Sequence, residues 1–221
     1  MTTPAMQVVS VNVGTARRLQ GRSFKGRTGI FKATVPDPVA VGETGLAGDA
    51  VLNTRYHGGP DQAIYLYRQE DYDWWARELG RELPPGTFGE NLTLQGLPAA
   101  NLPVGSQLDF ADLCLQVTAP RIPCNTLAER MSDSGFAKQF IKAERPGLYC
   151  RVLKQGSIRA GEAFSLSAPT DGNGISTLDM FRAAYRKLTA EELQRLLAAP
   201  IDIRSRQKYE AQLGKITSID R

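Results

Sequence analysis

Apolar and polar residues alternate along several short stretches of the chain, which is the spacing expected of β-strands. Residues 7–14 are the clearest example, because β-branched residues alternate there with polar ones. A hairpin is indicated around Ala111-Asp112, with apolar positions at Leu108, Phe110 and Leu113. Further extended stretches are predicted at residues 28–32, 39–41, 61–67, 148–154 and 163–167.

Two longer stretches have apolar residues at helical spacing instead. One is residues 68–83, which end before the helix-stopping sequence Pro84-Pro85-Gly86. The other is residues 125–142, in which Leu127 and Phe140 are expected to face inward. Many short strands with one or two inserted helices predict a mainly β fold, a bent and closed β-barrel.

The last fifty residues have a different character. Residues 168–174 resemble a linker, and helix-capping patterns follow at Ser176, Thr189 and Asp202. Helices of about ten residues are marginal alone, so this tail is expected to pack on the barrel, on itself or on a second copy in a homodimer. The predicted domains are a β-barrel domain at residues 1–168 and a three-helix domain at residues 174–221.

Composition and charge narrow the class of protein. The chain has 221 residues, of which 42% are apolar and 23% charged, as in ordinary globular proteins. It contains no apolar run of about 20 residues and no basic, apolar start, so we expect a cytoplasmic protein without a membrane span. Its 27 Lys and Arg are interleaved with 23 Asp and Glu, and no aromatic-basic stripe suggests nucleic-acid binding.

Cysteine and histidine are scarce. Cys114, Cys124 and Cys150 are too few for a disulfide framework, so reduced thiols are expected. His57 is the single histidine, which excludes sites that need two imidazoles. Cys114 and Cys150 fall within apolar strand patterns and are expected to be inert filler.

Two polar segments contain residue types that an ordinary loop does not need. Gly45-Leu-Ala-Gly-Asp49 is followed by a segment that includes His57-Gly-Gly-Pro-Asp-Gln-Ala63, where paired glycines permit positive φ or close approach to a ligand. A glycine-rich turn is the simpler interpretation of this string alone. In Phe88-Gly-Glu-Asn-Leu92, the side chains of Glu90 and Asn91 either order the loop or hold a polar ligand.

The third segment is Pro120-Arg-Ile-Pro-Cys-Asn125. Cys124 lies where a helix is predicted to begin, and Arg121 adds a positive charge nearby. A helix N-terminus and a cation both lower a thiol pKa, so Cys124 is the reactive candidate among the cysteines. From the residues alone, two chemistries remain open: acyl transfer by Cys124, His57 and Asn91, or binding of a soft metal by the thiolate.

In their order and separation, these segments resemble the MOSC domain, named for the C-terminal domain of molybdenum cofactor sulfurase. The resemblance covers most of the chain, and the trailing helices resemble the three-helix domain of YiiM-type members, a bacterial group linked to hydroxylaminopurine resistance. The matching segments are Arg27–Lys32, Gly45–Asp49, His57–Ala63, Phe88–Leu92, Arg121–Cys124 and Ile158–Glu162.

The resemblance implies a β-barrel with a molybdopterin cofactor and reduction of N-hydroxylated compounds, such as hydroxylaminopurine, to amines. Cys124 corresponds to the metal-ligating cysteine. The phosphate of the pterin calls for cations and backbone N–H groups, and His57 and Glu90 are candidate proton donors. The expected cofactor contacts are Arg27, Lys32, Gly48, Asp49, His57, Gly58, Gly59, Asn91, Arg121 and Cys124.

Electrons have to come from a separate reductase, because the chain contains no flavin or nicotinamide fingerprint. A non-catalytic carrier of the cofactor or of sulfur, using the same Cys124, is the alternative from a different functional class.

Overall fold

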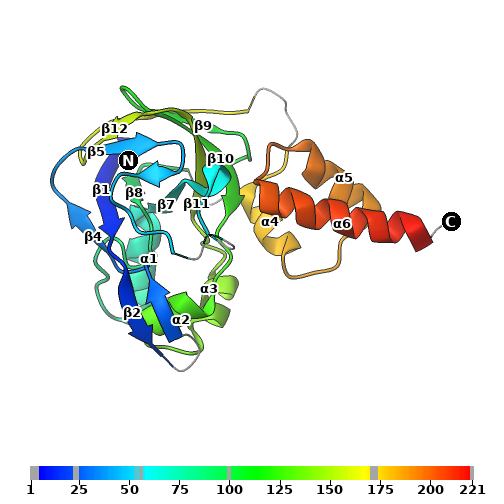
Figure 1. Ribbon diagram of the computed structural model, residues 1–221, viewed down its shortest axis with the longest axis horizontal. Helices are drawn as coiled ribbons and strands as arrows, with labels where there is room; N and C mark the ends of the chain where they lie inside the picture. The colour runs from blue at the N-terminus through cyan, green and yellow to red at the C-terminus, as the bar shows by residue number, and fades with distance from the viewer. Residues whose placement is uncertain are drawn as a thin grey trace.

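The computed structural model describes residues 5–21, 25–52, 54, 57–98, 101–169 and 174–219. These residues form a larger part rich in strands, from which a smaller helical part projects (Figure 1). No helix in the described ranges is both long and apolar enough to cross a bilayer.

The larger part is built on an eight-stranded sheet with the order β13-β9-β10-β11-β7-β8-β1-β4. Only β7 and β8 pair in parallel within it. Its strands are β1 (Gln7–Gly14), β4 (Lys32–Val35), β7 (Ile64–Arg68), β8 (Leu92–Gln95), β9 (Gln107–Asp109), β10 (Cys114–Pro120), β11 (Leu148–Lys154) and β13 (Ser165–Ser167). Two small sheets pair β12 (Gly156–Ile158) with β5 (Val39–Gly42) and β6 (Gly45–Leu46), and β2 (Arg17–Gln20) with β3 (Lys25–Thr28).

The prediction of a mainly β, closed barrel is wrong. The sheet has two ends, β13 and β4, which do not pair with each other in the described chain. The chain before β13 instead meets β1, through an isolated bridge between Gln7 and Ala163 and a backbone bond of 2.9 Å from Val8 N to Glu162 O. This contact is an isolated bridge and not a strand ladder, so the described sheet is not closed there. The helices make up a share of the fold similar to that of the strands.

Six α-helices and a short 3-10 helix lie in the described residues. They are η1 (Pro60–Gln62), α1 (Gln69–Leu79), α2 (Asn125–Met131), α3 (Phe136–Ala143), α4 (Thr177–Ala183), α5 (Ala190–Ala198) and α6 (Ile203–Ile219). The single helix predicted over 125–142 is two helices, because Ser132 adopts the left-handed conformation (φ 55°) and ends α2. The first predicted helix ends early, at Gly80 with φ 63°.

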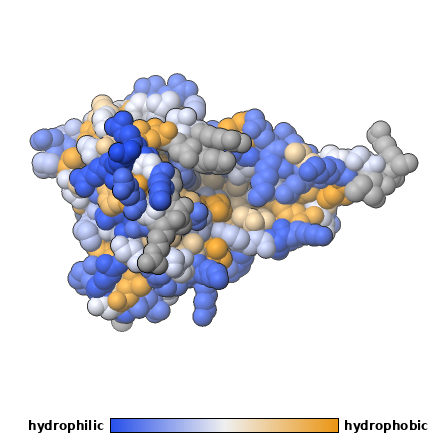
Figure 2. Space-filling model, turned by 60° about the horizontal axis from the view of Figure 1, so that its bottom comes forward, coloured by the Kyte–Doolittle hydropathy of each residue, from blue (hydrophilic) through white to orange (hydrophobic). Residues whose placement is uncertain are grey.

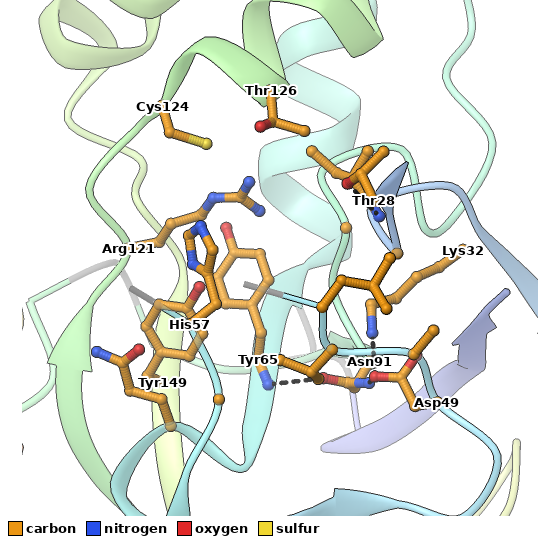
Figure 3. A pocket seen from close by; sticks show the side chains of 18 of the residues that line it. Thr28, Lys32, Asp49, His57, Tyr65, Asn91, Arg121, Cys124, Thr126 and Tyr149 are labelled. Atoms are coloured by element: carbon orange, nitrogen blue, oxygen red, sulfur yellow. Dashed lines mark hydrogen bonds and ion pairs between the residues drawn. The ribbon is translucent and has the colours of Figure 1, made fainter. Parts of the chain in front are cut away.

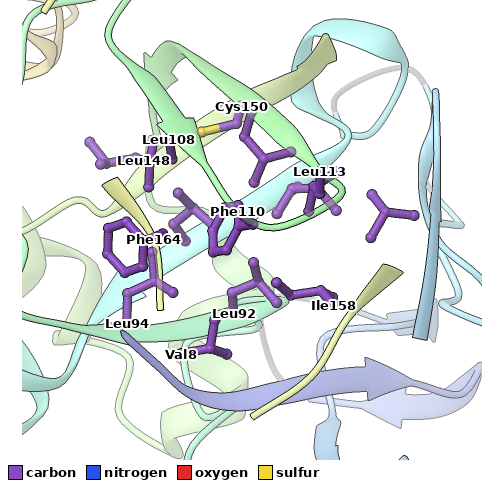
Figure 4. Close-up of a cluster of buried hydrophobic side chains, with 14 of the residues drawn as sticks. Val8, Leu92, Leu94, Leu108, Phe110, Leu113, Leu148, Cys150, Ile158 and Phe164 are labelled. Atoms are coloured by element: carbon purple, nitrogen blue, oxygen red, sulfur yellow. The ribbon is translucent and has the colours of Figure 1, made fainter. Parts of the chain in front are cut away.

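Two apolar clusters stabilise the larger part. One lies among the strands and includes Cys150, which is fully buried as expected (Figure 4). The other is aromatic and joins α1, α2 and α3 to β7: the Phe88 ring stacks on Tyr67 at 4.3 Å and lies 5.9 Å from Trp75. Phe88 is fully buried at the centre of this second cluster, directly before the Glu90-Asn91 segment.

The predicted helix caps in the C-terminal part are confirmed. Ser176 with Asp179, and Thr189 with Glu192, form reciprocal capping boxes at α4 and α5. Asp202 caps α6 by accepting bonds of 3.2 Å from the backbone N–H groups of Arg204 and Ser205. The chain changes from strand to helix between β13 and α4, and the boundary at 168–174 stays a prediction.

Replacing Phe88 by alanine should destabilise the protein by about 3–5 kcal/mol, because it opens a large cavity among packed rings. Chemical denaturation measures the free energy of unfolding. Leu153, which is 48% exposed, is the control, and Leu153→Ala should change that free energy by no more than about 0.5 kcal/mol. Equal effects of the two substitutions would contradict a central role for the aromatic cluster.

Candidate functional site

A pocket open to solvent, enclosing about 750 Å³, lies where the C-terminal end of β10 approaches the loops before β4 and β7. Figure 3 shows Cys124 and Thr126 at one end and Lys32, Asp49 and Asn91 at the other. The lining residues are Arg27, Thr28, Gly29, Ile30, Lys32, Asp49, Ala50, Val51, Leu52, His57, Gly58, Gln62, Ala63, Tyr65, Gly89, Asn91, Arg121, Cys124, Thr126 and Tyr149.

Cys124 occupies the N-cap position of α2 and has extended backbone angles. Burial raises the pKa of its thiol, but a hydrogen bond from His57 and the positive charge of Arg121 lower it to about 6. The backbone N–H of Leu127, in the first turn of α2, lowers the pKa further. At neutral pH the group is therefore a thiolate, which is the form that binds metals and attacks electrophiles.

Arg121 lies beneath this thiol and is only 4% exposed. Its guanidinium donates to the Phe88 carbonyl oxygen and stands 5.0 Å from the centre of the Tyr65 ring. Burial lowers its pKa, but Tyr65, Tyr149 and the Cys124 thiolate outweigh burial and raise the pKa above its ordinary value. The Arg121 Nε has no hydrogen-bond partner among the described residues, so part of its donor capacity is left over.

The other end of the pocket is a buried polar network. Lys32 forms an ion pair with Asp49, and burial lowers the pKa of Lys32 although Asp49 acts to raise it. That carboxylate also accepts hydrogen bonds from the Asn91 side-chain amide at 2.9 Å and from the Gly14 backbone N–H at 2.8 Å. Asn91 in turn accepts from the Tyr65 backbone N–H at 3.1 Å. The network joins the loop after β6 to the first residue of β4, to the residue before β8 and to the start of β7.

His57 is carried by a loop that the helical part holds in place. Gly58 and Gly59 both have positive φ, 70° and 82°, as their sequence predicts. Arg204 of α6 donates to the carbonyl oxygens of Gly58 and Thr54 at 2.8 Å each, and to that of His57 at 3.4 Å. An arginine about 150 positions along the chain therefore sets the course of the loop that brings His57 to the thiol.

The structure brings eight of the ten predicted cofactor contacts into this pocket, and it leaves out Gly48 and Gly59. Gly48 is solvent-exposed in the turn before Asp49 and has φ 79°, so its role is to make that turn. Gly59 supplies the extended, positive-φ residue before η1. The eight that line the pocket are Arg27, Lys32, Asp49, His57, Gly58, Asn91, Arg121 and Cys124.

Glu90, predicted as a proton donor, does not line the pocket. Its side chain is fully buried and accepts bonds from the Tyr72 hydroxyl and the Gly86 backbone N–H at 2.6 Å each, and from the Thr93 hydroxyl at 2.9 Å. Burial raises the pKa of Glu90 despite these bonds. Its observed contacts order the loop after Pro84-Pro85-Gly86 from the inside, so this carboxyl group is not among the groups that the structure places in the pocket.

Sequence reasoning missed the aromatic wall of the pocket. Tyr65 on β7 pairs with Tyr149 on β11, and the centres of their rings lie 5.0 Å apart. The burial pattern explains the omission, because residues 64–67 of β7 are all buried and alternation does not reveal which face borders a pocket. Gln62 was also missed, although it lies within the HGGPDQA segment.

Two alternative kinds of site lose support. Asn91 bonds to Asp49 and to the Tyr65 backbone, so it does not orient His57 as an acyl-transfer triad requires. In the part of the chain that the structure describes, no three His, Cys, Asp or Glu side chains cluster as metal ligands.

Burial raises the pKa of Cys150, and burial with Asp109 raises that of Cys114 to about 11, so neither is a thiolate at neutral pH.

Alkylation by iodoacetamide should report the thiolate at Cys124. Its rate should rise with pH around a midpoint near 6, because the thiolate dominates above the pKa of about 6 and the thiol below it. His57→Ala should move the midpoint upward by about one pH unit or more, since the hydrogen bond to the thiolate is lost. Cys114→Ala is the control and should leave the midpoint unchanged. A wild-type midpoint near 9 would contradict the assignment.

Replacing Arg204 by alanine should also change the reactivity of Cys124, because Arg204 acts on the thiol through the loop that carries His57. Without the bonds from Arg204 to the loop, His57 is less well placed, and the alkylation midpoint of Cys124 should rise. Arg206→Ala is a matched control on the same helix, because the Arg206 side chain bonds to the carbonyl oxygens of Leu197 and Ala199. Hydrogen exchange at residues 57–59 should quicken in the first variant only. Identical behaviour of the two variants would count against the Arg204 contact.

Comparison with known proteins shows which family this chain resembles. Residues 53–165 match the MOSC domain family. Uncharacterized protein YflK of Bacillus subtilis (strain 168) is 32% identical over 188 residues, 84% of this chain and 85% of its own length. A protein called Reductase from Gibberella moniliformis is 33% identical over 66% of this chain, but the match spans only 28% of that protein.

The YiiM proteins resemble this chain in sequence and in fold. YiiM of Escherichia coli (strain K12) is 31% identical over 140 residues, 62% of each protein. The crystal structure of YiiM from Geobacillus stearothermophilus is 28% identical and superposes with a TM-score of 0.77 over 94% of this chain and 99% of that one. These matches confirm the resemblance found in the sequence: the chain belongs to the MOSC domain family and is of the YiiM type.

Proposed function

We propose that this protein binds a molybdenum cofactor through Cys124 and reduces small N-hydroxylated compounds to amines. The observation that carries the proposal is a thiolate at one end of a pocket whose other charged lining residues are mostly basic. Lining residues Arg27, Lys32 and Arg121 are basic, and Asp49 is the acidic one, already paired with Lys32. This balance suits an anionic ligand that also offers a soft metal.

The chemistry of the donors fits a pterin cofactor that carries a metal. A cysteine thiolate is a good ligand for soft metal centres, and the pKa of about 6 keeps Cys124 in that form. Arg27 is exposed on β3 and offers a surface cation for a phosphate group, whereas the deeper Lys32 shares its charge with Asp49. The unpartnered Nε of Arg121 offers one more donor.

The reaction proposed is R–NH–OH + 2e⁻ + 2H⁺ → R–NH₂ + H₂O. The N–O bond breaks, the nitrogen gains a proton and the departing oxygen leaves as water. The cofactor, when bound, supplies the redox change, and a separate electron-transfer protein, acting as the reductase, supplies the two electrons. His57 is the residue that holds a transferable proton next to the thiolate, and Arg121 keeps that region positively charged.

The relatives support this assignment at the level of the class. A protein named Reductase shares the matched region as a small fraction of a longer chain, and the family name refers to molybdenum cofactor sulfurase. The alternative is a carrier that stores the cofactor on the same thiolate. Such a carrier differs from the reductase in that it binds the cofactor but does not turn over substrate.

Molybdenum and pterin should co-purify with the protein from a host that makes the cofactor. Metal analysis and pterin fluorescence should give about one of each per chain. With an artificial electron donor, benzamidoxime should be reduced to benzamidine, and Cys124→Ala should lower both the metal content and the turnover by at least about 100-fold. Cys114→Ala is the matched control and should keep both.

Each alternative predicts a different result. Wild-type protein without molybdenum or pterin would overturn the proposal. If the protein binds the cofactor but reduces no N-hydroxylated compound, the reductase function is rejected and the carrier function is retained. Full turnover in Cys124→Ala would remove Cys124 as the metal ligand.

A further inference from the structure

The β2–β3 hairpin forms a two-stranded sheet of its own, apart from the main sheet. Its register places Arg18 directly opposite Arg27, and Gln20 directly opposite Lys25. Successive residues of a strand point to opposite faces, so these four side chains share one face of the hairpin. All four are exposed. One face of the hairpin therefore presents three cations to solvent.

The charge on this face is not neutralised within the described part of the chain. None of the ion pairs among the described residues involves Arg18, Lys25 or Arg27. Like charges directly opposite each other on paired strands are destabilising, and Arg18 and Arg27 are such a pair. The hairpin gains no stability from this arrangement, so an anionic partner explains it better than packing does.

Further cations lie on the other face of the hairpin. Arg17 and Arg130 of α2 lie over the Phe31 ring, 5.9 Å and 4.7 Å from its centre. One acid offsets part of this charge, because the Glu129 carboxylate approaches the turn of the hairpin near Gly21. The surface around the hairpin is nevertheless strongly basic. This basic surface consists of Arg17, Arg18, Lys25, Arg27 and Arg130.

The basic surface borders the pocket that contains Cys124. Arg27 and Thr28 of β3 both line that pocket. Figure 3 shows Thr28 on the same side of the pocket as Thr126, at the start of α2. A protein that docks on the hairpin is therefore placed at the mouth of the pocket.

Two exposed apolar side chains complete the rim. Val51 and Leu52 line the pocket and are 38% and 43% exposed. Their loop lies against the chain after β3, where a Cβ added to Gly29 would come within 1.8 Å of the Ala50 carbonyl oxygen. In the view of Figure 2, strongly hydrophilic side chains are prominent on the strand-rich part, and hydrophobic ones gather in the recess beside the helical part. A partner that approaches the hairpin is therefore recognised mainly by charge.

The proposed reaction restricts the kind of partner. It consumes two electrons, and the sequence contains no flavin or nicotinamide fingerprint. A protein donor has to bring its redox centre close to the pocket, and electron-transfer complexes are small, weak and steered by charge. The basic surface meets these conditions for a donor whose own surface is acidic.

A nucleic acid fits the same surface less well. Single strands bind to aromatic rings on which their bases stack. The Phe31 ring already has the guanidinium groups of Arg17 and Arg130 over it, so it is not open to a base. No aromatic residue lies on the face that carries Arg18 and Lys25.

We propose that the basic surface is the docking site of an acidic, flavin-containing electron-transfer protein. This inference rests on the proposed reductase function and assigns the side of the pocket from which electrons enter. The reductant is the flavin hydroquinone, and the overall reaction is R–NH–OH + FlH₂ → R–NH₂ + H₂O + Fl. The flavin loses two electrons and two protons, the N–O bond breaks and the oxygen leaves as water.

The test uses flavodoxin, an acidic protein that carries flavin mononucleotide, as the probe. Reduced flavodoxin drives reduction of benzamidoxime at an ionic strength of about 0.01 M, where the screening length is about 30 Å. The double variant Arg18→Gln with Lys25→Gln should raise the KM for flavodoxin by about fivefold or more, because it removes two steering charges. Turnover with reduced methyl viologen should be unchanged, since neither residue lines the pocket.

The matched control is Lys154→Gln with Arg159→Gln, which removes the same charge from two other exposed positions. These residues flank β12, which lies at the opposite end of the strand-rich part from β2 (Figure 1). The control should keep the wild-type KM for flavodoxin.

Binding is measured separately, by isothermal titration calorimetry of oxidised flavodoxin with the protein without metal. The Kd should rise by about fivefold or more in Arg18→Gln with Lys25→Gln, and the difference should vanish at about 1 M salt, where the screening length is about 3 Å. The thermal midpoint of this variant should not fall, because the substitution removes the like-charge pair with Arg27.

Equal KM and Kd in the double variant and its control would overturn the docking site, as would the absence of flavodoxin binding at low ionic strength. Binding of a single-stranded oligonucleotide or of anionic lipid vesicles through Arg18 and Lys25, without binding of flavodoxin, would assign the surface to another partner.

The two proposals fail in different ways. A protein that never contains molybdenum, but binds flavodoxin through Arg18 and Lys25, would keep the acidic partner and reject the reductase function. A molybdenum-containing protein that reduces benzamidoxime with methyl viologen, and whose KM for flavodoxin is unchanged in the double variant, would keep the reductase function and reject the docking site.

Discussion

Arg121 carries a full positive charge in the interior, where taking an ion out of water costs several kcal/mol. Three neighbours offset that cost: the Phe88 carbonyl oxygen, the face of the Tyr65 ring and the Cys124 thiolate. The dependence is mutual, because the same charge lowers the pKa of Cys124. Phe88 is the centre of the aromatic cluster and Cys124 begins α2, so one guanidinium joins the packing of the larger part to the chemistry of the pocket.

The helical part controls the second influence on the thiolate. His57 supplies the hydrogen bond that lowers the pKa of Cys124, and its loop is held by Arg204 from α6. The start of α6 is anchored in turn, since the Ile203 backbone N–H donates to Asp61 at 2.8 Å and Asp61 pairs with Arg151 of β11 at 3.0 Å. A packing appendage has no need of such directed polar contacts. They indicate that the position of the helical part is set relative to the site.

The sequence was most informative where local physics decides the outcome. A cysteine before a helix, with an arginine three residues earlier, is enough to predict a thiolate, and paired glycines are enough to predict positive φ at Gly58 and Gly59. It failed where tertiary contacts decide. Glu90 is polar between apolar neighbours whether it faces a ligand or, as observed, the buried Tyr72 hydroxyl. The contribution of Arg204 depends on a contact across about 150 residues, which no local pattern encodes.

Tyr149 links these arrangements. Its ring packs against the aromatic cluster and against a cluster that includes Met180 of α4 and Leu193 of α5, and it lines both the Cys124 pocket and the hollow between the strand-rich and helical parts. A shift of the helical part therefore moves the shared wall of both spaces, and with it the loop that positions His57. The contacts of Arg204 therefore also hold the loop of His57, whose hydrogen bond lowers the pKa of the Cys124 thiol. Changes in α6 that displace this loop should then raise the pKa of Cys124.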